Sequence, residues 1–391
     1  MTRSFVFSSE SVTEGHPDKV ADNVSDAVLD ALLAKDPASR VACETFVATE
    51  LAVVAGEITS TGFDEIDLEK IVRDTIVDIG YDAPERGMDG AGCELKLRLV
   101  EQSPDIAMGT AARADAKIGA GDQGMMFGYA EQGREETDYM PVPISLAHGL
   151  THRLTEVRRS GQLGYLRPDG KSQVSVRYED GEPVGVDAIV LAAQHDPDVD
   201  QESLRADLIE HVVRPVIPDD WLTADTEYFV NHTGKFVKGG PAADTGLTGR
   251  KIIVDTYGGW IPHGGGAFSG KDPTKVDRSA AYYARYAAKN LVAAGAAERL
   301  QIQVAYAIGS LEPVSINVDT FGTAKMPEQD IEALLRSEFS FAPGNIIEQL
   351  DLRSPVFKQT AAYGHFGRSD LDLAWERLDR VEAVQNVAPL A

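Results

Sequence analysis

The stretch Gly264-Gly265-Gly266-Ala267-Phe268-Ser269-Gly270-Lys271-Asp272 is the best starting point for working out how this chain is organised. It follows an apolar run at residues 252–254, which predicts a buried strand, and it precedes a helical pattern that begins near Arg278. Four glycines within seven residues let a backbone turn sharply and direct successive N–H groups at one anion. The stretch therefore predicts a phosphate loop, with a glycine-rich surface loop that binds nothing as the alternative.

Charged residues accompany the glycines. Lys271, Lys275 and Arg278 supply cations, while Asp272 and Asp277 are candidate metal ligands. This order of loop, cations and carboxylates suits a polyphosphate loaded with magnesium.

The loop differs from the common nucleotide-binding motifs. The P-loop pattern fits from Gly265 to Lys271, but Asp272 stands where a hydroxyl should reach the metal, and Pro273 interrupts the expected helix. The dinucleotide fingerprint fails because Ser269 replaces its last glycine. The sequence thus predicts a phosphate loop of another kind.

The composition limits the class of protein. A length of 391 residues predicts two or three domains, and 43% hydrophobic with 25% charged residues is typical of a globular protein. The net charge, 37 − 62 = −25, argues against a nucleic-acid partner or an anionic membrane surface. Two cysteines and the lack of a signal peptide or transmembrane run at the N-terminus lead us to expect a cytoplasmic protein.

A second motif, Gly15-His16-Pro17-Asp18-Lys19, precedes apolar residues at positions 20, 24, 28 and 32, which predict an amphipathic helix. Pro17 suits a first helical position, which places His16 at the helix N-terminus, where free N–H groups favour anions. His16 is a candidate hydrogen-bond donor to a phosphate, and Asp18 is a candidate metal ligand. A capping turn with a solvated histidine is the alternative.

Two strand-like runs follow at 41–47 and 51–58, and each holds one glutamate in apolar surroundings. A carboxylate in such a place is costly without a cation partner. Glu44 and Glu57 are therefore candidates for binding a metal ion or an ammonium group, unless they face solvent on the outer side of a sheet.

The order helix, strand, strand, helix recurs three times along the chain. We predict an α+β fold of three similar helix-on-sheet domains related by a pseudo-threefold internal repeat. The domains are placed at 1–102, 122–233 and 234–391, with interleaving of chain segments allowed, and 103–121 is predicted to be a mobile active-site loop. Disorder without function is the alternative for that loop, and the tail after Arg368, with Trp375, is predicted to lie on the surface.

More cations fall on predicted turns. Such turns are Arg167–Lys171, Gly234–Lys235 and Gly246–Lys251, and Phe236 adds an aromatic face on which a purine could stack. Asp122, within Gly119-Ala120-Gly121-Asp122-Gln123-Gly124, lies between glycines and is open to close approach by a ligand.

These motifs resemble the S-adenosylmethionine synthetase family over about residues 7–368. The resemblance is carried by the motifs Gly15–Lys19, Gly119–Gly124 and Gly264–Asp272, and by Ala42–Thr45, Gly56–Glu57, Gln102–Asp105, Lys171–Val174, Gly246–Thr256 and Ala362–Arg368. It implies synthesis of S-adenosylmethionine: the sulfur of L-methionine attacks the 5′ carbon of ATP, and tripolyphosphate leaves and is cut to phosphate and pyrophosphate. A thioether has no proton to lose, so cations and magnesium, rather than a general base, are what this chemistry needs.

The resemblance also implies roles for single residues. Those implied to be catalytic are His16, Asp122, Lys171, Arg250 and Lys271. Those implied to bind ATP are His16, Asp169, Lys171, Lys235, Phe236, Asp244, Arg250, Lys251, Ala267 and Lys271. Those implied to bind methionine are Glu57, Gln102, Asp122, Asp244 and Lys275. Asp18 and Asp277 are implied to hold two Mg²⁺ per active site, and Glu44 one K⁺ per subunit.

The resemblance further implies a dimer of dimers with active sites at the dimer interface, and neither a nucleic-acid nor a membrane partner. Lys235 departs from the family pattern because it stands where an Arg is usual, so a planar fork is replaced by a point charge. Two other classes of protein are alternatives. A kinase or ATPase would transfer the γ-phosphate without methionine, and an acidic scaffold would have little use for so many cations on glycine turns.

Overall fold

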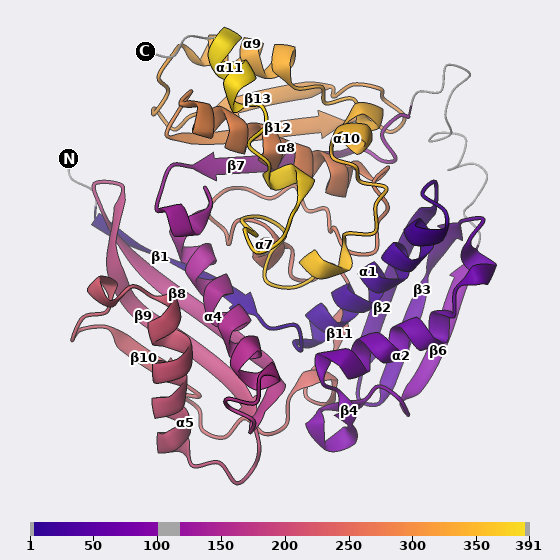
Figure 1. Ribbon diagram of the computed structural model, residues 1–391, viewed down its shortest axis with the longest axis vertical. Helices are drawn as coiled ribbons and strands as arrows, with labels where there is room; N and C mark the ends of the chain where they lie inside the picture. Colours follow the sequence, from indigo (N-terminus) through magenta and orange to yellow (C-terminus); the bar gives the residue numbers. More distant parts are fainter. Residues whose placement is uncertain (1–3, 101–117, 388–391) are drawn as a thin grey trace.

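The computed structural model describes residues 4–100 and 118–387, which form three lobes around a common centre (Figure 1). Each lobe consists of a β-sheet with one long helix packed against it. This arrangement confirms the predicted α+β fold of three similar helix-on-sheet units.

The first lobe contains the sheet β11-β2-β3-β6. Its strands are β11 (Gly246–Leu247), β2 (Arg40–Ala48), β3 (Leu51–Thr59) and β6 (Glu94–Val100), and its helices are α1 (Pro17–Lys35) and α2 (Leu68–Ile79). A short ribbon of β4 (Asp82–Ala83) and β5 (Met88–Asp89) lies beside it. Strands β2 and β3 pair antiparallel, and β6 runs parallel to β3.

The second lobe contains the sheet β1-β8-β9-β10. Its strands are β1 (Ser4–Val12), β8 (Leu166–Glu179), β9 (Glu182–His195) and β10 (Glu227–Val230), and its helices are α4 (Val142–Arg159) and α5 (Gln201–Leu208). Helix α4 packs on β1 and β8, and this lobe has an apolar core of its own.

The third lobe contains the sheet β13-β12-β7. Its strands are β13 (Ser315–Asp319), β12 (Arg299–Tyr306) and β7 (Gly124–Glu131), and its helices are α8 (Val276–Ala294), α9 (Glu328–Glu338), α10 (Pro343–Gln349) and α11 (Val381–Val387). The apolar core of this lobe is continuous with that of the first lobe, and Trp260 packs against both this core and the core of the second lobe.

Each sheet draws a strand from a distant part of the chain. The N-terminal β1 pairs with β8, β7 from the middle of the chain pairs with β12, and β11 pairs with β2. Segments of the chain therefore alternate between the three lobes, as the sequence prediction allowed. Loops from all three lobes reach the centre.

Three local predictions were wrong. Residues 252–254 lie in the short helix α7 (Ile252–Asp255), not in a buried strand, and Ile253 is exposed. The expected turn at 167–171 is part of β8, where the pairing with β9 shifts register. Trp375 is buried, because its ring stacks on Tyr282 with centroids 4.2 Å apart.

Among residues 4–100 and 118–387, no helix has the length and apolar character needed to cross a membrane.

Candidate functional site

One row of aspartates on α1 organises the centre of the molecule. Asp18, Asp22, Asp26 and Asp30 are spaced four residues apart, so they share one face of the helix. Each accepts main-chain N–H groups from a part of the chain far away in sequence. The donors are Leu247 for Asp18, Gly249 for Asp22, Gly270 for Asp26, and Phe357 with Lys358 for Asp30, at 2.8–3.0 Å. The row thereby fixes both cation-bearing loops against one helix.

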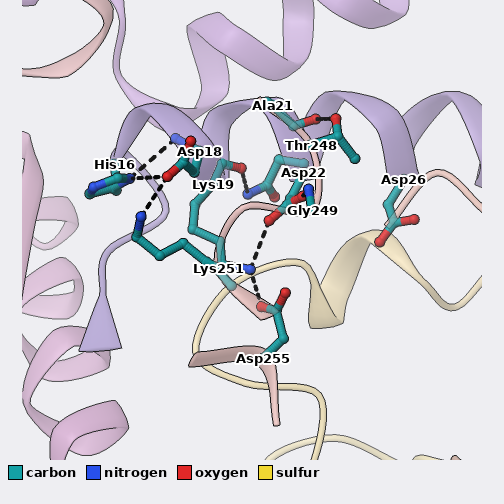
Figure 2. Close-up of polar contacts among 12 residues, drawn as sticks. His16, Asp18, Lys19, Ala21, Asp22, Asp26, Thr248, Gly249, Lys251 and Asp255 are labelled. Atoms are coloured by element: carbon teal, nitrogen blue, oxygen red, sulfur yellow. Dashed lines mark hydrogen bonds and ion pairs between the residues drawn. The ribbon is translucent and has the colours of Figure 1, made fainter. Parts of the chain in front are cut away.

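The first turn of α1 brings two predicted site residues together. His16 is the N-cap, and its Nδ1 accepts the Asp18 N–H at 3.2 Å (Figure 2). Asp18 Oδ2 lies 2.5 Å from Lys251 Nζ, and Asp18 Oδ1 lies 3.9 Å from Arg250 Nη1. The Arg250 side chain is 55% exposed, so most of its donors remain free. A histidine, two cations and a carboxylate thus meet at a helix N-terminus, where anions are favoured.

Burial and nearby charge set the protonation of this group. Burial lowers the pKa of His16 to about 3, and the positive charges of Lys251 and Lys171 act in the same direction. The imidazole is therefore neutral near pH 7, and because Nδ1 accepts a hydrogen bond, Nε2 carries the proton and can donate it. Burial acts to raise the pKa of Asp18, but the hydrogen bonds from Lys251 and Leu247 outweigh it, so this pKa is lowered.

A second ion-pair group lies directly beneath the first. The Lys19 ammonium is fully buried between Asp22, at 2.9 Å, and Asp255, which it also contacts (Figure 2). Asp255 is the last residue of α7, and its N–H donates to Lys251 O at 2.9 Å. Lys19 therefore ties the segment that carries Lys251 to α1. No role for Lys19, Asp22 or Asp255 was predicted from the sequence.

The glycine loop lies against both α1 and α8. Gly270 has a positive φ of +79°, and a Cβ there would meet Cys43 O at 1.9 Å, so only glycine fits. The loop also touches the neighbouring cation segment, since a Cβ on Gly249 would lie 2.4 Å from Ala267 Cβ. Lys271 Nζ lies 2.6 Å from Asp277 Oδ2 near the start of α8. The predicted lysine and the predicted metal ligand are thus neighbours.

Two other charged residues of this region have structural partners. Asp272 is fully buried and accepts hydrogen bonds from Val41 N, at 2.7 Å, and from Lys275 Nζ. Its expected role as a metal ligand is therefore not supported by its surroundings. Arg278 is fully buried and donates twice to Asp26, at 2.8 Å each, so it does not face the loop as a free cation.

The predicted nucleoside residues lie where β8 and β9 meet the loop 235–240. Asp169 is 6% exposed, and its Oδ2 accepts the Gly240 N–H at 2.9 Å. Its Oδ1 is buried and has no hydrogen-bond partner among the residues that the structure describes. Burial raises the pKa of Asp169 to about 6, while the Gly240 N–H and Lys171 lower it in part. Phe236 is half-buried in the same loop.

The remaining predicted residues are more exposed. Lys171, Lys235, Asp244, Asp122, Glu44 and Glu57 all have exposed side chains. Lys235 Nζ donates to Pro197 O at 2.6 Å. Asp122 lies near Lys275, because Gly121 N donates to Thr274 O at 3.1 Å. Gln102 and most of the predicted loop 103–121 lie outside the described residues.

Glu44 and Glu57 lie on the outer face of the first sheet. In β2, residues 41, 43, 45 and 47 are buried while Glu44 points the other way, and Glu57 pairs with Ala42 in register on β3. In one subunit, then, solvent exposure, the alternative considered from the sequence, describes both glutamates.

The donor set fits magnesium better than a transition metal. Mg²⁺ prefers one or two carboxylates together with substrate phosphates, and Asp18 and Asp277 each offer one carboxylate beside a lysine that the sequence predicted to bind phosphate. Within 4–100 and 118–387, no group of three or more His, Cys, Asp or Glu side chains is placed to hold a metal alone.

Comparison with known proteins agrees with this geometry. Residues 4–104, 117–236 and 238–377 match the family models described as the N-terminal, central and C-terminal domains of S-adenosylmethionine synthetase. The chain is 57% identical over 390 residues to the S-adenosylmethionine synthase of Clostridium botulinum (strain Alaska E43 / Type E3), covering 97% of this chain and 98% of the relative. It is 55% identical over 391 residues to that of Clostridium tetani (strain Massachusetts / E88), covering 98% and 99%.

Proposed function

The chain belongs to the S-adenosylmethionine synthetase family, and from this premise we propose how its residues make S-adenosyl-L-methionine from ATP and L-methionine. The enzyme is a methionine adenosyltransferase. The methionine sulfur attacks the 5′ carbon of ATP, the C5′–O bond breaks, and tripolyphosphate leaves and is hydrolysed to phosphate and pyrophosphate. The neutral thioether has no proton to lose, so the protein must mainly stabilise charge on the leaving group.

The observation that carries this proposal is the meeting of His16, Arg250 and Lys251 around Asp18 at the N-terminus of α1. The cations Arg250 and Lys251, with Lys171 and Lys271, bind the phosphates, and the backbone at Ala267 contributes from the glycine loop. His16 donates a hydrogen bond from its Nε2–H to a phosphate oxygen, and its neutral form and the contact at Nδ1 support this role. Fixed donors of this kind need no reorganisation when the negative charge develops.

Asp18 and Asp277 would hold two Mg²⁺ per active site. Magnesium, when bound, neutralises phosphate charge and so assists departure of tripolyphosphate. Binding would draw each carboxylate from its lysine, which is then free to contact a phosphate. Glu44 would hold one K⁺ per subunit, and this assignment rests on the family resemblance.

Asp169 and Phe236 would bind the nucleoside. Asp169 Oδ1, which has no hydrogen-bond partner within residues 4–100 and 118–387, supports this role, since a buried acceptor without a donor is costly and a ribose or base donor would satisfy it. Lys235 and Asp244 are exposed charges on the stretch of chain that holds Phe236 and Gly240. Methionine would contact Glu57, Gln102, Asp122, Asp244 and Lys275.

We further propose a cytoplasmic homo-oligomer, a dimer of dimers, with active sites at the dimer interface. The exposed outer face of the first sheet supports this, because Glu57 lies there, away from the α1 side, and a partner could supply it to a site of another subunit. Sedimentation analysis would test the oligomeric state.

The bond that breaks distinguishes this reaction from phosphoryl transfer. ATP labelled with ¹⁸O at the 5′ bridging position would be incubated with methionine, Mg²⁺ and K⁺. Attack at the 5′ carbon sends the label into the polyphosphate products, whereas transfer of the γ-phosphate leaves it on the nucleotide. Label retained on the nucleotide would overturn the proposal.

A further inference from the structure

The last residue of β9 contacts Phe236 through both its main chain and its side chain. His195 is 1% exposed, and its main-chain N–H donates to Phe236 O at 3.0 Å. In return, the Phe236 N–H donates to His195 Nε2 at 3.1 Å. Both main-chain polar groups of Phe236 are thus held by one buried residue.

The other ring nitrogen fixes the orientation of the imidazole. His195 Nδ1 lies 2.7 Å from Asp196 O. A carbonyl oxygen only accepts, so Nδ1 carries the hydrogen and Nε2 presents its lone pair to the Phe236 N–H. The Gln201 amide nitrogen approaches the same Nε2 at 3.4 Å as a second, longer donor. The contacts at the two ring nitrogens therefore select the tautomer that carries its hydrogen on Nδ1.

The residues on either side strengthen this arrangement. The Gln194 side chain donates to Val237 O at 3.1 Å and to Arg86 O at 2.9 Å. Lys235 Nζ donates to Pro197 O at 2.6 Å. The segment 235–237 is thus attached at three successive residues to the end of β9 and the residues that follow it. Among the residues described, no aromatic ring stacks on Phe236, so its ring can accept one.

We propose that His195 is a positioning residue for the adenine of ATP, acting by holding the main chain of Phe236 so that its ring is ready to stack. This inference rests on the proposed function, because it takes Phe236 as the adenine contact. In the described part of the chain, His195 has no hydrogen bond or ion pair with the proposed phosphate-binding cations, so its effect should be confined to substrates that carry a base.

Two variants of similar size separate the acceptor from the rest of the side chain. In His195→Asn the amide nitrogen replaces Nδ1 but no acceptor reaches Phe236, whereas in His195→Gln the amide oxygen falls near the position of Nε2. We expect the KM for ATP to rise about five- to tenfold in His195→Asn, since a buried N–H loses its partner, and to change about twofold or less in His195→Gln. Hydrolysis of added tripolyphosphate, which has no base, should keep its KM and kcat in both.

A double-mutant cycle tests the route of action. On a Phe236→Ala background, His195→Asn should add little to the rise in KM for ATP. The proposal would be overturned by equal effects of His195→Asn and His195→Gln on the KM for ATP, or by a parallel loss of tripolyphosphate hydrolysis. It would also be overturned if the His195→Asn protein fails to fold while the His195→Gln protein folds and binds ATP poorly. Full additivity with Phe236→Ala would overturn it as well. A wild-type enzyme that makes no S-adenosylmethionine would instead overturn the proposed function.

Discussion

Lys251 Nζ lies 2.5 Å from Asp18 Oδ2, so a proposed phosphate-binding cation and a proposed magnesium ligand form an ion pair with each other. The same relationship recurs across the site, where Lys271 Nζ lies 2.6 Å from Asp277 Oδ2. In each pair, the cation and the carboxylate lie close together and are partly buried. When magnesium and polyphosphate bind, the carboxylate would pair with magnesium and the cation with a phosphate. Magnesium and polyphosphate should therefore bind together more readily than either binds alone.

Asp18→Asn should lower kcat about a hundredfold or more, because the amide keeps the size of the side chain and can still accept the Leu247 N–H, but carries no charge to hold magnesium. Steady-state kinetics at several Mg²⁺ concentrations would measure this. Asp74→Asn is the matched control, since Asp74 pairs with Lys70 on the exposed face of α2. Equal activity of the two variants would contradict the role of Asp18.

Lys271→Met should lower kcat for both S-adenosylmethionine synthesis and tripolyphosphate hydrolysis, each by about a hundredfold, because both need the same charge on the polyphosphate. Lys70→Met serves as the surface control. A loss confined to one of the two activities would show that Lys271 does not act on the polyphosphate common to both.

Lys19→Met should destabilise the protein by about 3–5 kcal/mol, because Asp22 and Asp255 would remain buried without their cation. Urea unfolding followed by circular dichroism would measure this. Lys35→Met, which removes an exposed cation at the end of the same helix, should stay within about 1 kcal/mol. Similar losses in the two variants would contradict a special role for the buried pair.

Asp169 should make stability depend on pH. Burial raises its pKa from 3.8 to about 6 in the folded protein, so the native state holds the proton more tightly than the unfolded chain. The resulting stabilisation is present below about pH 4 and is lost as pH rises through about 6, on the order of 2–3 kcal/mol in all. Asp169→Asn should remove this slope. Unfolding curves at pH 4, 5, 6 and 7 that fall equally in both proteins would contradict it.

Much of the fold follows from local patterns in the sequence. The period of four at Val20, Val24, Val28 and Leu32 predicted α1, and Pro17 correctly placed His16 at its N-cap. Strands in which apolar and polar residues alternate were also predicted correctly, because one face of each is buried. The apolar run at 252–254 was wrongly predicted to be a strand, since three residues cannot distinguish a buried strand from one turn of helix.

The site was only partly predictable. Glycines and cations on loops led to the prediction of phosphate-binding segments, because this combination of residues is unusual outside such sites. The row of aspartates on α1, Asp18, Asp22, Asp26 and Asp30, repeats every four residues and could have been recognised in the sequence. Its hydrogen-bond partners could not, because they come from segments more than 200 residues away. The hold of His195 on Phe236 gave no such signal, because it depends on the register at the end of β9.

The measurement that tests this account most directly is product analysis after incubation of the purified protein with ATP, L-methionine, Mg²⁺ and K⁺. Mass spectrometry and phosphate assays would follow the products with and without methionine. We predict S-adenosylmethionine with equal amounts of pyrophosphate and phosphate, all dependent on methionine. Formation of ADP and phosphate at the same rate without methionine would contradict it.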